Sequence, residues 1–134
     1  MTKIANKRLV ENFFDYFVKP DVDGALSLLT KNAKWRVMGQ QGGLPISGEM
    51  DGQGIAVLMN DIKELMSERL QLIATGWTIE DNRVAVEITS NATMKNGKKY
   101  HNLYHFLIVI SDDKIETIRE YMDTDQVKRV FLDS

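Results

Sequence analysis

Residues 100–123 read YHNLYHFLIVISDDKIETIREYMD. The stretch predicts two long strands joined by a tight acidic turn. A half-buried strand usually alternates apolar residues with charged ones, so that one face of the sheet is dry and the other is wet. Here Asn102, Tyr104 and Phe106 occupy alternate positions. A face that mixes polar and aromatic side chains indicates a sheet wrapped around a pocket.

Composition limits the class of protein. The 134 residues suffice for one domain with a real core, which we expect to span 1–134. The net charge of −2 and the scattered positive charges do not favour nucleic acid or an anionic membrane as a partner. Cysteine is absent, which excludes disulfides and thiolate chemistry. The N-terminal segment has no apolar signal core, and no run approaches the ~20 apolar residues of a membrane span, so we expect a cytoplasmic protein.

Apolar spacing and turn residues predict the order of elements. Leu9, Phe13 and Phe17 recur at helical spacing, and Lys19-Pro20 ends that helix because a residue before proline avoids the helical region. Helices are predicted at 4–18, 25–29, 55–66 and 123–131, strands at 33–38, 70–80, 83–94, 100–110 and 115–122, and a glycine-rich loop bordering a pocket at 39–54. This order is typical of an α+β fold with an antiparallel sheet.

Asn96-Gly97 is the strongest hairpin signal in the chain, because a type I′ turn needs positive φ at both central residues. A two-residue turn here places Thr89 opposite Tyr104 and Glu87 opposite Phe106. The pairing divides the hairpin into a polar face and an apolar face. The polar face holds Glu87, Thr89, Asn91, Asn102 and Tyr104, and the apolar face holds Val84, Val86, Ile88, Leu103, Leu107 and Val109.

Two interpretations of these faces stay open. In the first, the polar face meets water and the helices cover the apolar face. In the second, the polar face lines a ligand cavity and a second subunit covers the apolar face. Phe106 and Ile108 lie on the polar face, which carries few full charges, and this mixture suits a cavity.

Three segments carry a resemblance that covers nearly the whole chain: DVDG at 21–24, NGKKY at 96–100 and KIETIREYMD at 114–123. In these segments the chain resembles the SnoaL-like and ketosteroid-isomerase-like branch of the nuclear-transport-factor-2-like superfamily. The resemblance implies an α+β cone, in which a strongly curved antiparallel sheet wraps around a cone-shaped cavity closed by three N-terminal helices. It also implies a homodimer formed through the outer face of the sheet, which favours the second interpretation.

The resemblance to ketosteroid isomerases also locates catalytic positions. Their general base falls at Val37, which cannot move a proton. The tyrosine of their oxyanion site falls at about Phe13, and the aspartic acid of that site falls at Tyr104, which can still donate a hydrogen bond. Two of three roles are lost, so this mechanism is not expected here.

Limonene epoxide hydrolases resemble the C-terminal half of the chain, and their catalytic Asp-Arg-Asp set falls at Thr89, Glu87 and Glu120. Only Glu120 keeps its character, so that set cannot operate unchanged. What remains is a pair of carboxylates, Glu87 and Glu120, in a cavity with apolar walls. Burial and a second carboxylate both raise a carboxyl pKa, and such a group can move protons near neutral pH. The alternative is that both glutamates are solvated, or that Glu87 pairs with an arginine.

The length of the acidic turn decides which side chains of the last strand face the pocket. A two-residue turn points Arg119 and Tyr121 inward, whereas a three-residue turn points Ile118, Glu120 and Met122 inward. The resemblance favours the second arrangement.

The predicted site therefore has a catalytic part and a binding part. The catalytic candidates are Glu120, Glu87 and Tyr104. The substrate-binding candidates are Asn102, Asn91, Thr89, Trp35, Val37, Phe13, Phe17, Met59, Phe106, Ile118 and Met122.

No metal and no cofactor are predicted. His101 and His105 lie about 13 Å apart along a strand, too far for one ion, and Gly52-Gln53-Gly54 lacks the third glycine of a dinucleotide fingerprint. We therefore expect a cofactor-independent enzyme, an isomerase, cyclase, dehydratase or hydrolase, that performs proton-transfer chemistry on a small, partly apolar molecule. The alternative is a non-catalytic ligand-binding or accessory module with the same fold and the same dimer.

Overall fold

The computed structural model of the chain describes residues 2–39 and 48–133. Its helices are α1 (Lys3–Val18), α2 (Val22–Ser27), α3 (Gly52–Leu65) and α4 (Thr124–Val127), and a π-helical turn, η1 (Lys128–Leu132), follows α4. Its strands are β1 (Leu29–Val37), β2 (Gly48–Met50), β3 (Gln71–Glu80), β4 (Arg83–Thr93), β5 (Lys99–Ser111) and β6 (Lys114–Met122). The predicted α+β class is confirmed.

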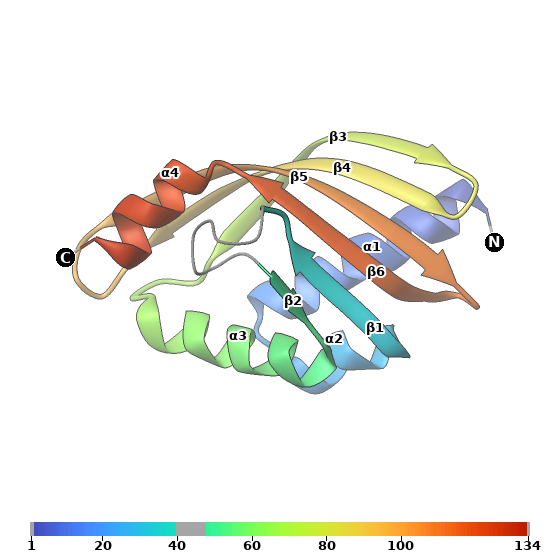
Figure 1. Cartoon of the computed structure of the whole chain (residues 1–134), viewed down its shortest axis with the longest axis horizontal. Helices are drawn as coiled ribbons and strands as arrows, with labels where there is room; N and C mark the ends of the chain where they lie inside the picture. The colour runs from blue at the N-terminus through green and yellow to red at the C-terminus, as the bar shows by residue number, and fades with distance from the viewer. Residues whose placement is uncertain (1, 40–47, 134) are drawn as a thin grey trace.

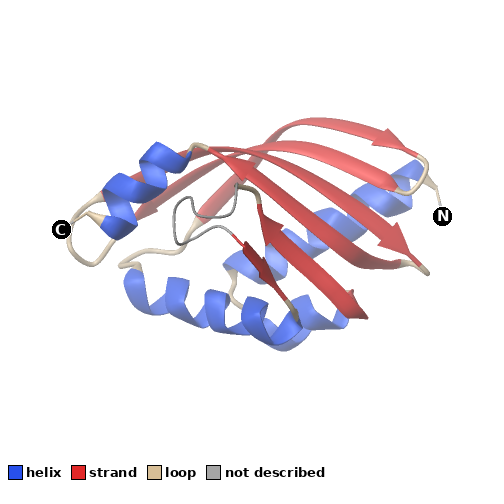
Figure 2. Ribbon diagram, viewed as in Figure 1, coloured by secondary structure: helices blue, strands red, loops and turns tan. Residues whose placement is uncertain are grey.

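One six-stranded sheet, in the order β2-β1-β6-β5-β4-β3, curves over the helices. The long helices α1 and α3 lie on one side of it, and α4 lies near one end of the sheet (Figures 1 and 2). Strands β3 to β6 pair antiparallel in sequence order, whereas β1 pairs with β6 in parallel. The sheet is therefore mixed rather than wholly antiparallel, and the curved cone is otherwise as predicted.

Short polar side chains start the three longer helices. Thr2, Asp21 and Asp51 each accept a hydrogen bond from the backbone N–H three residues further along the chain. These bonds satisfy donors that the first turn of a helix leaves free. Helix α1 ends at Val18, directly before Lys19-Pro20, as predicted.

Two predicted boundaries near the first strand are wrong. The segment predicted as a loop at 39–54 contains β2 and the start of α3, because Asp51 caps a helix that begins at Gly52. Strand β1 starts at Leu29 rather than at residue 33, because Leu29 pairs with Ile115 of β6. This partner is distant in the sequence, so local pattern does not reveal it. The rest of the predicted loop, 40–47, lies outside the described residues.

The hairpin between β4 and β5 corrects the predicted register. A three-residue loop, 95–97, joins the strands, and its last residue, Gly97, has a φ of +87°. Glycine supplies the left-handed conformation that such a loop needs. As a result Ile88, not Thr89, lies opposite Tyr104. Every pairing shifts by one residue, and because side chains alternate along a strand, the two faces of β4 exchange.

This exchange overturns both predicted faces of β4. The apolar residues point inward and are buried: Val84, Val86 and Ile88. The polar residues point outward: Glu87, Thr89 and Asn91. The inner face of the sheet is therefore more apolar than predicted, and its polar side chains come mainly from β5.

Strand β6 reaches its predicted orientation by a different route. Asp112 and Asp113 form a two-residue turn, and both have positive φ, 50° and 63°. Such a turn alone would point Arg119 inward. The pairing with β5 then shifts by one residue, and Glu116 of β6 is the extra residue of this bulge. Glu120 therefore faces the inside of the sheet, as predicted.

Candidate functional site

A cavity of about 280 Å³ lies between the inner face of the sheet and the helices. Four aromatic residues form one side of it, with neighbouring ring centroids 4.9–6.0 Å apart: Phe14, Phe17, Trp35 and Phe106. Further apolar side chains complete the wall: Leu58, Ile62, Leu65, Met66, Leu70, Leu72, Met122, Val127 and Phe131. Within the described part of the chain, four polar side chains line the cavity: Asp61, Tyr100, Tyr104 and Glu120.

Glu120 lies on β6, opposite Phe106 of β5, and only 8% of it is exposed. Its Oε1 accepts a hydrogen bond of 2.8 Å from Trp35 Nε1. Burial raises the pKa of Glu120 to about 7, although the bond from Trp35 acts in the opposite direction. Near neutral pH the carboxyl group is therefore present in both protonation states and can accept and return a proton.

A pair of tyrosines supplies the other polar groups of the cavity. The hydroxyl oxygens of Tyr100 and Tyr104 lie 2.5 Å apart, and the ring of Tyr104 stacks on Phe106 with centroids 5.3 Å apart. Burial raises the pKa of both tyrosines, and the nearby Glu120 raises it further. Both hydroxyls therefore stay protonated at neutral pH and can donate hydrogen bonds.

Asn102 lies buried behind this pair and is not part of the cavity wall. Its Nδ2 donates to Tyr100 Oη at 2.9 Å and to the backbone oxygen of Asp123 at 3.2 Å. Its Oδ1 accepts from the backbone N–H groups of Leu103 and Asp123. Since the protein uses all four positions of the amide, Asn102 supports Tyr100 instead of contacting a ligand as predicted.

The other predicted residues divide between the cavity and the core. Those that line the cavity are Phe17, Trp35, Tyr104, Phe106, Glu120 and Met122. Those that do not line it are Phe13 and Ile118, which are buried in the core, Met59, which lines a neighbouring hollow, and Val37, which lies beside Glu120 in the sheet. Phe13 lies in the core behind the cavity wall, where its ring packs against the rings of Phe17 and Trp35.

Three predicted residues, Glu87, Thr89 and Asn91, lie on the outer face of the sheet and away from the cavity. The three-residue hairpin loop is the reason, since it shifts β4 by one residue. The predicted pairing of Glu87 with Glu120 in one cavity is therefore wrong. Burial, and not a second carboxylate, accounts for the raised pKa of Glu120.

Two polar residues of the cavity were missed in the sequence, Tyr100 and Asp61. Tyr100 had a signal, because it precedes Asn102 and Tyr104 with a spacing of two and so shares their face of the strand. Asp61 had none: a single acidic residue on an amphipathic helix is common, and only the packing of α3 against the sheet brings it to the cavity wall.

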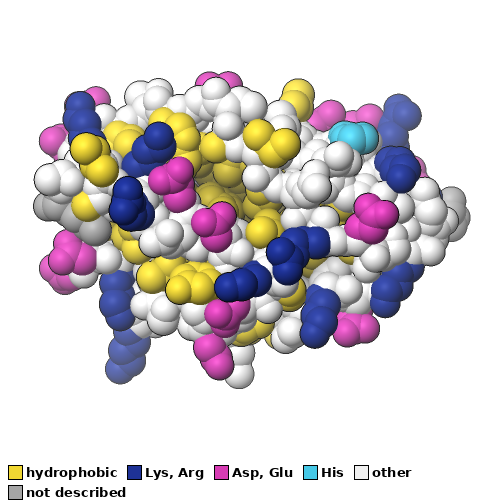
Figure 3. Space-filling view, turned by 180° about the vertical axis from the view of Figure 1, so that it is seen from behind, with side chains coloured by type: hydrophobic (Ala, Val, Ile, Leu, Met, Phe, Trp, Pro, Cys, Tyr) yellow, Lys and Arg dark blue, Asp and Glu magenta, His cyan; other side chains and the backbone are white. Residues whose placement is uncertain are grey.

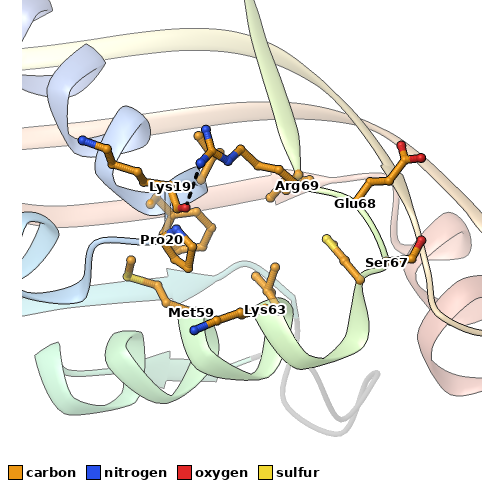
Figure 4. Close-up of a pocket in the computed structure, with 12 residues that line it drawn as sticks. Lys19, Pro20, Met59, Lys63, Ser67, Glu68 and Arg69 are labelled. Carbon is orange, nitrogen blue, oxygen red and sulfur yellow. Dashed lines mark hydrogen bonds between the residues drawn. The ribbon is translucent and has the colours of Figure 1, made fainter.

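A smaller hollow of about 160 Å³ adjoins this cavity. Figure 4 shows it between the end of α1 and the C-terminal part of α3, where Arg69 Nη2 donates to the backbone oxygen of Lys19 at 3.2 Å. The two hollows share four apolar side chains: Phe17, Ile62, Met66 and Leu70. Of the two, the larger cavity is the candidate site because it contains Glu120 and the tyrosine pair.

Residues 2–39 and 48–133 contain neither a metal-binding cluster nor a membrane-spanning helix. No group of three histidine, aspartate or glutamate side chains in these ranges is placed to hold a metal ion. Within the same ranges, no helix is long and apolar enough to cross a membrane. His101 and His105 are exposed on the outer face of β5. On the side of the molecule shown in Figure 3, acidic and basic side chains are interspersed around hydrophobic groups.

Solved structures with the same fold match this chain over almost its full length. An NTF2-like protein from Burkholderia xenovorans is 22% identical, with 96% of this chain and 97% of that chain covered and a TM-score of 0.77. A putative isomerase from Bacillus subtilis is 19% identical, with coverages of 98% and 96% and a TM-score of 0.79. The pinacolase BvnE from Penicillium brevicompactum is 15% identical, with coverages of 95% and 92% and a TM-score of 0.80. At these identities the likeness concerns the fold alone.

Sequence comparison identifies the family. No curated protein sequence matches the chain. The family model of the SnoaL-like domain, however, matches residues 10–118, from α1 into β6. This match and the NTF2-like structural neighbours confirm the resemblance noted in the sequence. The chain therefore belongs to the SnoaL-like family of the NTF2-like superfamily.

Proposed function

We propose that this protein is an enzyme that moves protons on a small, largely apolar molecule bearing a carbonyl or hydroxyl oxygen. The proposal rests on the position and the raised pKa of Glu120. It is a buried carboxyl group with a pKa of about 7 in the wall of an apolar cavity that also presents tyrosine hydroxyls. General acid–base catalysis is most efficient when the pKa of the catalytic group lies near the working pH. The cavity of about 280 Å³ suits a compact ligand.

Each polar group has a role in this chemistry. Glu120 takes a proton from the carbon next to a carbonyl group and returns it to another atom of the substrate. Trp35 holds the carboxyl group in place through its 2.8 Å hydrogen bond. Tyr104 donates to the substrate oxygen as negative charge develops there. Proton removal next to a carbonyl is shared by isomerisation, aldol-type cyclisation and dehydration. Solved structures of the same fold include one named as a putative isomerase and one named as a pinacolase, so the fold is compatible with an enzymatic role.

Deuterium exchange tests the proposal. The protein is incubated in D₂O with a panel of compact ketones, and mass spectrometry follows deuterium uptake at the carbon next to the carbonyl. We expect at least one ketone to exchange faster with the folded protein than with the same protein after heat denaturation. If NMR shows that ketones occupy the cavity and none of them exchanges faster, the proposal is wrong.

A non-catalytic ligand-binding module is the second candidate. It is favoured by the loss of the epoxide hydrolase set, since Thr89 and Glu87, two of its three positions, point away from the cavity. The same experiment separates the candidates, because a binding module holds the ketone without promoting exchange.

We also propose a homodimer formed through the outer face of the sheet. Val86 and Ile88 do not belong to this contact, because both side chains point inward and are buried. The outer face instead presents Leu103, Ile73 and Tyr121, which are 68%, 57% and 43% exposed. Apolar side chains exposed together on one surface are typical of a contact with another protein, here a second copy.

The substitution Leu103→Glu is expected to shift the protein from dimer to monomer in analytical ultracentrifugation, because it places a charge on the apolar outer face. Ile4→Glu is the matched control, since Ile4 is 75% exposed on α1 and lies outside the sheet. A wild-type protein that sediments as a monomer at micromolar concentration would contradict the proposed dimer.

A further inference from the structure

We propose that the smaller hollow is a second binding subsite, which takes the carboxylate end of an elongated ligand whose apolar end fills the larger cavity. Lys63 and Arg69 are the side chains that recognise the carboxylate. The proposal rests on the proposed function only for the location of the main site. It adds the class of ligand, a carboxylic acid whose apolar part is long enough to pass from one space into the other.

Helix α3 lines both spaces, because two adjacent stripes of its surface face them. Residues three or four positions apart share one stripe of a helix. One stripe holds Leu58, Asp61 and Leu65 and faces the larger cavity. The next stripe holds Met59 and Lys63 and faces the hollow. A ligand that follows this helix therefore meets both spaces without leaving its surface.

Four apolar side chains separate the two spaces, and each of them lines both: Phe17, Ile62, Met66 and Leu70. The partition is therefore one side chain thick. The backbone N–H of Met66 donates to the backbone oxygen of Ile62 at 3.1 Å, which fixes the main chain there. The Met66 side chain is unbranched and has three rotatable bonds, so it adapts to what lies beside it. A change of its rotamer joins the hollow to the cavity.

The sizes of the two spaces support a ligand that occupies both. The larger has a volume of about 280 Å³ and the smaller about 160 Å³. Each alone is smaller than the ~300–1,000 Å³ of most ligand pockets, and joined they fall within that range. The compact part of the ligand then fills the larger cavity, and the remainder extends over Met66 into the hollow.

The charges of the two walls differ in sign. Within the described residues, the larger cavity is lined by two charged residues, both acidic: Asp61 and Glu120. The charged residues that line the hollow are three basic and one acidic: Lys19, Lys63, Arg69 and Glu68. An anionic group is therefore repelled from the larger cavity and attracted to the hollow. This difference orients an elongated acid in one direction.

The donors of Lys63 and Arg69 are available to a ligand. Figure 4 shows both side chains extending toward Lys19 and Pro20, whereas the Glu68 carboxylate points away from them. Arg69 Nη2 donates to the backbone oxygen of Lys19 at 3.2 Å, which holds the guanidinium group at the hollow and leaves its other N–H groups to donate. Among the described residues, no carboxylate forms a salt bridge with either side chain. A guanidinium and an ammonium group are the usual partners of a carboxylate.

Two series of probes with the same shape test the proposal. One series runs from phenylpropanoate to phenylhexanoate, with the ring at the far end of the chain, and the other consists of the corresponding neutral primary amides. We expect NMR titration to show that the wild-type protein prefers the carboxylate by about fivefold to tenfold at the best chain length. This value lies between the effect of an exposed ion pair and that of a buried charged hydrogen bond. Added salt should reduce the preference, because both basic side chains are exposed.

Lys63→Gln and Arg69→Gln should each reduce the preference about twofold to threefold, and the double variant should abolish it, while the affinity for the amides stays unchanged. Lys63 makes no hydrogen bond or salt bridge among the described residues, so its replacement removes a charge without the loss of a native contact. Lys34→Gln and Arg83→Gln are the matched controls. They remove the same charges from exposed positions on β1 and β4 that line neither space, and should leave the preference intact.

Methionine methyl groups report where the probe lies. Met59 lines only the hollow, Met122 lines only the larger cavity, and Met66 lines both. In protein isotopically labelled at its methionine methyl groups, the preferred carboxylate should shift the signals of all three. The probes carry no ketone and the readout is equilibrium binding, so a failure of the proposed proton transfer remains distinguishable from a failure of this proposal.

Three results would overturn the proposed subsite. The first is that the wild-type protein binds neither series, or binds carboxylate and amide equally. The second is a preference for the carboxylate that the double variant of Lys63 and Arg69 retains. The third is a carboxylate that shifts Met59 or Met122 but not both, because the ligand would then occupy one space alone.

Discussion

Replacement of Glu120 by glutamine is expected to lower the rate of proton exchange into a bound ketone by about 10²–10⁴-fold, the usual contribution of a positioned acid–base group. Glutamine has nearly the same shape and can still accept the hydrogen bond from Trp35 Nε1. It cannot accept and return a proton near neutral pH. Exchange measured by mass spectrometry should therefore fall, while the affinity for the ketone changes little.

Glu87→Gln is the control for this prediction. It makes the same chemical change on the outer face of β4 and should leave exchange at the wild-type rate. Equal losses in both variants would contradict the observed register of the hairpin. An unchanged rate in Glu120→Gln would remove Glu120 from the chemistry, and the ligand-binding module would then be the better description.

The same substitution should change how stability depends on pH. The pKa of Glu120 is 4.5 in the reference state and about 7 in the folded protein, because burial penalises the anion. Between these values the folded protein holds a proton that the unfolded chain has released. The contribution of Glu120 to stability is therefore fully present below about pH 4.5 and is lost as the pH rises through about 7.

The predicted loss is about 3 kcal/mol over this range, from about 1.4 kcal/mol for each unit of pKa. Glutamine does not titrate, so the difference in unfolding free energy between Glu120→Gln and wild type should move in favour of the variant by up to that amount between pH 4 and pH 8. Urea denaturation at several pH values, at one protein concentration, measures it. Parallel pH profiles for the two proteins would show that Glu120 titrates normally in the folded state.

Much of the fold was predictable because its signals are local. The spacing of Leu9, Phe13 and Phe17 indicates a helix with one apolar face, and all three are buried. The residue pair Lys19-Pro20 ends that helix where expected. The alternation of Asn102, Tyr104 and Phe106 correctly indicated a strand whose inner face mixes polar and aromatic groups. Such patterns depend on helix and strand geometry and not on distant partners.

The register of the sheet was not predictable in the same way. A two-residue turn at Asn96-Gly97 and the observed three-residue loop both use glycine with positive φ, so the motif does not distinguish them. The bulge at Glu116 likewise leaves no strong local signal, although it decides that Glu120 faces inward. The predicted two-residue turn at Asn96-Gly97 assigned Glu87, Thr89 and Asn91 to the wrong face of the sheet. A shift of one residue in the pairing moves every side chain of a strand to the opposite face.

The sequence by itself determined the family, through its resemblance at 21–24, 96–100 and 114–123 and the family match over residues 10–118. It also determined the α+β class and the residue types from which a site could be built, since these follow from composition, spacing and turn chemistry. Only the tertiary structure decided which polar groups meet. In the folded chain, Trp35 is hydrogen-bonded to Glu120, and Tyr100 to Tyr104. Asn102 is hydrogen-bonded to Tyr100 from behind the cavity wall, and Glu87 lies on the outer face of the sheet. The physical reason is that these contacts form between separate strands, where a loop length or a bulge sets the register, and burial then gives Glu120 a pKa that no isolated glutamate has.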